Sequence, residues 1–82
     1  MNQQRLLHLR GEAVTLWRLR RHDGDHLHCF IVEPPSGFWL AIEKGADLLF
    51  SQTYEDLDGA LARSEGLKSP LVVAGWMETS DH

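Results

Sequence analysis

TYEDLDGALARSEGLKSPLVVAGW, residues 53–76, contains the one substantial helix that the sequence predicts. Apolar and small side chains recur in it at steps of three and four residues, which is the period of a helix with one buried stripe. The members of this stripe are Leu57, Leu61, Ser64, Leu67, Leu71 and Ala74. We therefore predict a helix over residues 53–74, packed through this stripe against the rest of the chain.

Both ends of this helix carry recognisable signals. Thr53 is a candidate N-cap, because its hydroxyl can accept a hydrogen bond from a free N–H of the first turn. Pro70 disfavours a regular helix, so we expect a kink or an interruption near it. Gly75 is suited to a left-handed stop, with Trp76 folding back onto Leu71. An alternative interpretation takes residues 71–76 as a strand.

The residues before the helix predict an antiparallel sheet over residues 13–52. Short apolar runs are separated by turn signals, among which Asp23-Gly24 is typical of a two-residue hairpin. The four predicted strands are residues 13–21 (AVTLWRLRR), 26–33 (HLHCFIVE), 38–43 (FWLAIE) and 48–52 (LLFSQ). Short links make sequential strands neighbours. The fold class is therefore α+β, a four-stranded antiparallel meander followed by one C-terminal helix on one face of the sheet.

The chain of 82 residues is expected to form a single domain, 1–82. Residues 1–4 are polar and are expected to be disordered. Residues 5–11 (RLLHLRG) fit a short strand or a helical turn, and the pattern does not decide between them.

A two-residue turn at Asp23-Gly24 fixes the register of the first hairpin and predicts which face the helix covers. It places Trp17 opposite Phe30. Because both side chains are large and aromatic, we expect their face of the sheet to be the one that the helix covers. The other face then carries Leu16, Arg18, Arg20, Leu27, Cys29, Ile31 and Trp39. A slip of one residue would exchange the two faces.

We predict that these seven residues form an interaction surface, because so apolar a face is rarely left open to water. Either this face or the edge of the sheet is expected to meet another surface. A second copy of the chain is the simplest partner, which makes the protein a homo-oligomer, in the first instance a homodimer. Another protein is the alternative partner.

Composition restricts the function further. The net charge is −4, with five Arg against three acidic residues in 1–28 and three basic against nine acidic residues in 29–82. Cys29 is the single cysteine, which excludes an internal disulfide. The N-terminus lacks the apolar region of a signal peptide, and no apolar run approaches the length of a membrane span. We expect a cytoplasmic protein with no membrane association.

Candidate chemistry is confined to the first hairpin. His22, Asp25, His26 and His28 could together ligate a divalent metal ion, although hairpin tips are polar in any case. Cys29 is more consistent with a small buried hydrophobe than with a nucleophile. Glycine-rich phosphate loops and hydrolase signatures are absent from the sequence. We therefore expect no enzymatic activity, no cofactor and no metal.

An alternative function is the binding of single-stranded nucleic acid. Arg18, Arg20 and Arg21 accompany sheet aromatics such as Trp39, and such combinations stack bases beside basic groups. The acidic balance disfavours this interpretation, because phosphate contacts dominate nucleic-acid affinity.

The order of four strands and a helix closing on Gly75-Trp76 resembles a class of small uncharacterised bacterial proteins with a curved sheet and one long helix. The topology is also similar to PUR and Whirly domains, a resemblance that implies single-stranded nucleic-acid binding. Residues 53–61 (TYEDLDGAL) loosely resemble the helix start of HicB-type antitoxins. The DNA-binding segment that many of those antitoxins carry is not matched here.

Overall fold

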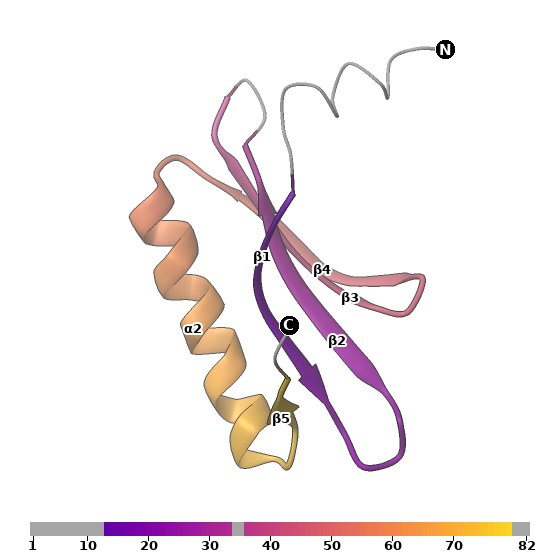
Figure 1. Ribbon diagram of the computed structural model, residues 1–82. Coiled ribbons are helices and arrows are strands. Elements are labelled where there is room, and N and C mark those ends of the chain that lie inside the picture. Colours follow the sequence, from indigo (N-terminus) through magenta and orange to yellow (C-terminus); the bar gives the residue numbers. More distant parts are fainter. Residues whose placement is uncertain (1–12, 34–35, 80–82) are drawn as a thin grey trace, which may run out of the picture.

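The computed structural model describes residues 13–33 and 36–79, and it confirms the α+β class (Figure 1). Its elements are β1 (Val14–Arg20), β2 (His26–Val32), β3 (Phe38–Lys44), β4 (Asp47–Tyr54), α2 (Leu57–Val73) and β5 (Met77–Glu78). The strands form one antiparallel sheet in the order β4-β3-β2-β1-β5, and α2 packs on one of its faces. The predictions for residues 1–4 and 5–11 lie outside the described residues.

The helix begins four residues later than predicted. Asp56 is the N-cap, and its Oδ1 accepts a hydrogen bond from the Gly59 N–H at 2.7 Å. Thr53 lies inside β4, where it pairs with Trp39 of β3, so the prediction of Thr53 as the cap is wrong. A carboxylate also suits the positive end of the helix dipole better than a hydroxyl does.

The helix continues through Pro70 to Val73, so the strand interpretation of residues 71–76 is wrong. Its end matches the predicted left-handed stop. Gly75 has φ +114°, its N–H donates to the Val72 oxygen, and the Trp76 N–H donates to the Leu71 oxygen. This pair of bonds is a Schellman motif, which satisfies carbonyls that the helix leaves without partners.

The motif turns the chain into β5, a short strand that the sequence did not predict. β5 pairs with the end of β1, through Leu19 with Glu78 and Arg20 with Met77. Lys68 of α2 binds the Glu78 carboxylate, and this hydrogen bond raises the pKa of Lys68. The helix is thereby tied to the edge strand that follows it.

The first hairpin has a three-residue loop instead of the predicted two-residue turn. The Arg21 N–H donates to the Asp25 oxygen at 3.0 Å, so residues 22–24 form the loop. Gly24 has φ +98°, which a three-residue hairpin loop requires at its last position.

This difference of one residue moves β2 by one position along β1. Trp17 pairs with Cys29, not with Phe30, and Leu19 pairs with Leu27. Trp17 still faces α2 as predicted, but Phe30 points to the opposite face. The predicted register is therefore wrong, and with it the predicted distribution of β2 side chains between the two faces.

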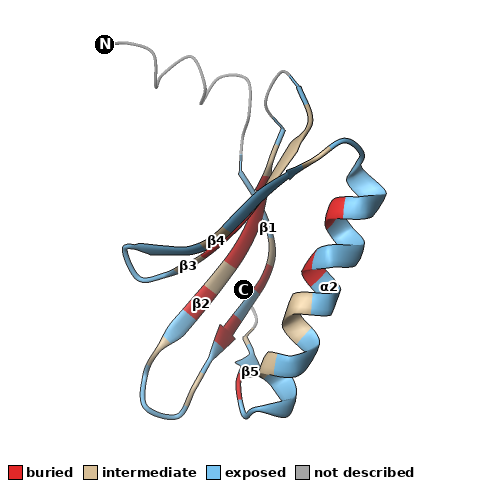
Figure 2. Cartoon of the chain, turned by 180° about the vertical axis from the view of Figure 1, so that it is seen from behind, coloured by how far each residue is buried: buried red, intermediate tan, exposed pale blue. Residues whose placement is uncertain are grey.

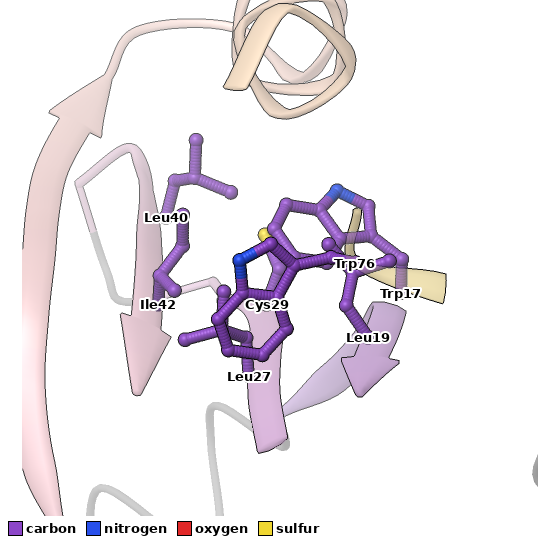
Figure 3. Close-up of a cluster of buried hydrophobic side chains, with 7 residues drawn as sticks. All are labelled: Trp17, Leu19, Leu27, Cys29, Leu40, Ile42 and Trp76. Carbon is purple, nitrogen blue, oxygen red and sulfur yellow. The ribbon is translucent and has the colours of Figure 1, made fainter. Parts of the chain in front are cut away.

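The core lies between the sheet and α2. Figure 3 shows a cluster of seven of its buried residues, which are Trp17, Leu19, Leu27, Cys29, Leu40, Ile42 and Trp76. The Trp17 indole N–H donates to the Ser64 carbonyl oxygen of α2 at 3.2 Å and joins the two layers. Burial of these side chains, at roughly 1.5–3 kcal/mol for each large one, is the main stabilising contribution to the fold.

The buried side of α2 agrees with the predicted stripe only in part. Ser64 is buried, and Leu67 and Leu71 pack against the core. Ala60 is fully buried although it was not assigned to the stripe. Leu57 and Leu61 are 44% and 36% exposed, so their assignment to the buried stripe is wrong.

Candidate interaction surfaces

The seven residues predicted to form one uncovered surface lie on both faces of the sheet. Leu27, Cys29 and Ile31 are buried on the face that α2 covers, because of the shifted register. Leu16 also packs against that core. The other three members, Arg18, Arg20 and Trp39, lie on the opposite face. The structure therefore does not bring the predicted surface together.

The face of the sheet turned away from α2, here called the far face, carries an aromatic group at its centre. The ring centroid of Phe30 in β2 lies 5.1 Å from that of His28 and 6.0 Å from that of Trp39. His28 Nε2 lies 2.8 Å from the Thr15 hydroxyl, across β1 and β2. Phe30 is 8% exposed, and Trp39 is half-buried. The far face therefore carries a row of rings at its centre, beside Val32 and Ala41, which pair with Trp39 and Phe30.

Charged residues border this row. Arg18 and Arg20 alternate with the core residues of β1, so they lie on the far face. Glu43 of β3 lies opposite His28. Arg21 does not join them. Its guanidinium lies 4.5 Å from the centroid of the Trp76 ring and 2.9 Å from the Asp25 carboxylate.

The hairpin tip is organised by ion pairs. Asp25 binds Arg21 and lies 3.4 Å from Lys44 of β3, and the hydrogen bond from Arg21 is the main cause of a lowered pKa at Asp25. In the described part of the chain, no three His, Cys, Asp or Glu side chains are grouped so that they could hold a metal ion. His22, Asp25, His26 and His28 are thus not assembled into the metal site that their spacing suggested.

Cys29 occupies the centre of the core and is fully buried (Figure 3). Burial raises the pKa of its thiol to about 12, with a smaller contribution from the charge of Glu65. A thiolate is the nucleophilic form of cysteine. At neutral pH this thiol is therefore protonated and shielded, which is unsuited to nucleophilic catalysis.

β4 forms an open edge of the sheet. It is the outermost strand, and no strand within residues 13–33 and 36–79 pairs with its outer side. Most of its residues are exposed (Figure 2), including the large apolar side chains of Leu48 and Leu49 at 52% and 56%. It contains neither lysine nor proline, the residues that commonly protect an edge from pairing.

Comparison of the chain with protein-family models, curated proteins and solved structures found no match. The resemblances to small bacterial proteins, PUR and Whirly domains and HicB-type antitoxins therefore remain predictions. Within the described ranges, no helix has the length and apolar character needed to cross a membrane.

The sequence did not identify the central residues of the far face, and it suggested an edge of the sheet without assigning that edge to β4. The assignment of Phe30 and His28 depended on a loop that is one residue longer than predicted. The open edge could have been inferred, because the first and last strands of a meander are its edges and residues 47–54 lack protective residues.

Proposed function

We propose that this protein is a non-catalytic interaction module that self-associates through its uncovered sheet surface. The observation that carries the proposal is the open β4 edge, whose residues are mostly exposed. An unpaired edge presents a row of backbone donors and acceptors that another strand can satisfy. An identical chain supplies such an edge, and twofold symmetry is the simplest way to close the assembly.

The far face supports the same proposal less strongly. Phe30 and Trp39 provide apolar area, but Arg18, Arg20 and Glu43 interrupt it. Bringing two copies of this face together would bury these charges, which costs free energy unless each finds a partner. β4 has no charged side chain between Leu48 and Tyr54, so its burial does not carry this cost.

Sedimentation velocity over a wide range of protein concentration tests self-association. We expect a species of twice the 9.3 kDa chain mass to accumulate as concentration rises. A matched pair of variants separates the two surfaces. Gln52→Lys, in the middle of β4, should weaken the dimer, whereas Trp39→Ala should leave it largely intact. A monomer at the highest soluble concentration would contradict the proposal.

The second candidate function is the binding of single-stranded nucleic acid. The structure places Arg18 and Arg20 on the same face as Phe30 and Trp39, an arrangement suited to backbone contacts beside stacked bases. The net charge of −4 opposes this function. Fluorescence anisotropy with single-stranded oligonucleotides at low salt tests it.

A specific site predicts that Arg18→Ala or Arg20→Ala weakens binding and lowers the slope of log affinity against log salt by about 0.7 for each phosphate that the variant no longer neutralises. Arg63→Ala is the matched control, because Arg63 lies on α2 beside Phe50 and away from the far face. Absence of binding at low salt, or equal reductions in affinity for all three variants, rejects this function.

A further inference from the structure

The backbone of β4 indicates how two copies would pair. Residues 50–54 pair with β3 in unbroken register, whereas a register shift precedes Phe50. A Cβ added at Gly37 would lie 2.9 Å from the Tyr54 carbonyl oxygen, so this carbonyl points toward β3. Backbone groups alternate in direction along an antiparallel strand. The N–H and C=O groups of Ser51 and Thr53 therefore point away from β3, in the plane of the sheet, toward the open edge.

Symmetry restricts the pairing further. Two antiparallel copies of one strand in a continuous sheet are related by a twofold axis perpendicular to that sheet, so one residue faces its own copy. Gln52 is the centre of the regular segment, and only an axis beside it uses all five residues of 50–54. With the axis there, Ser51 lies opposite the partner's Thr53. The backbone N–H and C=O groups that these two residues direct away from β3 then hydrogen-bond to each other.

The side chains are compatible with this register. On the side of α2, Phe50 would face the partner's Tyr54, and such aromatic pairs stabilise antiparallel strands. On the far face, Ser51 and the partner's Thr53 bring two hydroxyls together. Gln52, which is exposed and accepts a hydrogen bond from the Tyr54 hydroxyl, would face its own copy. None of residues 50–54 has a charged side chain, so this pairing brings no like charges together.

We propose, resting on the self-association above, that two copies of the chain pair antiparallel through β4, with Gln52 at the twofold axis. The two five-stranded sheets then become one continuous sheet with both α2 helices on the same face. β5 covers part of the opposite edge, at β1, which favours β4 as the joining edge.

Cysteine cross-linking of the full chain tests this register. Gln52→Cys places two thiols across a non-hydrogen-bonded pair, where Cα atoms are about 4.5 Å apart and a disulfide fits. Ser51→Cys is the matched control. Position 51 of one copy would lie diagonally across from position 51 of the other, about 7–8 Å away, which is too far for easy formation of a disulfide. Wild-type protein controls for Cys29, which is fully buried.

With oxidised glutathione as oxidant, we expect Gln52→Cys to form a covalent dimer at least about tenfold faster than Ser51→Cys. An equimolar mixture of Ser51→Cys and Thr53→Cys should form the mixed dimer, since those positions face each other. This second arm keeps the test valid should Gln52→Cys fail to fold.

The outcomes separate the two proposals. A dimer in sedimentation that shows neither cross-link overturns the β4 register but leaves self-association standing. Equal cross-linking rates at Gln52, Ser51 and an α2 control such as Ala62→Cys indicate random collision and also overturn it. A wild-type chain that stays monomeric overturns both.

Discussion

At the scale of single residues, burial decides what a side chain can do. Cys29 is chemically the most versatile side chain of the described residues, yet its position beneath Trp17 and Trp76 makes it a packing residue (Figure 3). Trp17 shows the complementary case. Its ring fills the core, and its one polar atom is satisfied by the Ser64 carbonyl, as a buried indole requires.

We predict that Cys29 reacts with a thiol reagent such as dithionitrobenzoate only through opening of the fold. At pH 8 the labelling rate should fall far below that of the urea-unfolded chain, because the thiol is buried and protonated. Labelling of the native protein as fast as of the unfolded chain would contradict the burial of Cys29.

The same thiol predicts a loss of stability at alkaline pH. Its pKa is about 12 in the folded protein against 9.0 in the unfolded chain. Between these values the unfolded chain releases a proton that the folded chain retains, so the free energy of unfolding falls as pH rises from 9. Urea titrations of the wild type and Cys29→Ala should show a steeper alkaline decline for the wild type.

At the scale of elements, the two ends of α2 are set by individual residues. Asp56 holds the first turn through the Gly59 N–H, and Gly75 ends the last turn in a conformation with positive φ. Pro70 lies inside the helix without ending it, and the motif centred on Gly75 forms the stop. These local devices place Trp76 in the core and β5 beside β1.

We predict that Asp56→Ala lowers the free energy of unfolding by about 0.5–2 kcal/mol, the usual cost of removing an N-cap. Thr53→Ala is the matched control and should cost less, because Thr53 is an exposed residue of β4 and caps nothing. Urea denaturation followed by far-ultraviolet circular dichroism at low protein concentration measures both. If Thr53→Ala lowered the free energy of unfolding more than Asp56→Ala does, Thr53 would be the N-cap, as the sequence alone suggested.

A pair of glycines, one inside α2 and one just after its C-cap, allows a second comparison. Gly75→Ala should destabilise by about 1–2 kcal/mol, because an L side chain is strained at positive φ even though an added Cβ meets no atom. Gly66→Ala should stabilise by about 0.5–1 kcal/mol, since Gly66 is helical, exposed and surrounded by open space. Thermal unfolding should therefore shift in opposite directions for the two variants, and shifts of the same sign would contradict this account.

At the scale of the whole molecule, the sheet has more surface than one helix covers. α2 covers one face, whereas the far face and the β4 edge remain uncovered by any described residue outside the sheet itself (Figure 2). A domain of this size buries a smaller fraction of its surface than a larger one and is only marginally stable. Association would therefore stabilise the fold as well as cover the edge.

We predict that the Tm of the wild type rises with protein concentration, by about 2–5 °C for each tenfold increase where the dimer dominates. Gln52→Lys should abolish this dependence, because two positive charges would face each other at the twofold axis. Ala62→Lys adds the same charge at an exposed position of α2 and should retain it. Scanning calorimetry at several concentrations measures all three proteins.

The class and order of the elements follow from local patterns in the sequence. The apolar periods, Asp23-Gly24 and Gly75 are local signals, because they depend on neighbours within one or two turns of chain. They correctly indicated a meander of four strands, a C-terminal helix and its left-handed stop. The local signal at the helix start was ambiguous, since Thr53 and Asp56 are both chemically competent caps and only the length of β4 distinguishes them.

Contacts between distant segments set which side chains share a face and which strand is left open. One additional loop residue moved Phe30 to the far face and Cys29 into the core, because side chains alternate along a strand and a shift of one position exchanges their sides. No local sequence pattern predicts β5, because a strand of two residues forms only through its pairing with β1. Register and edge are properties of contacts between distant segments, and no periodicity within one segment determines them.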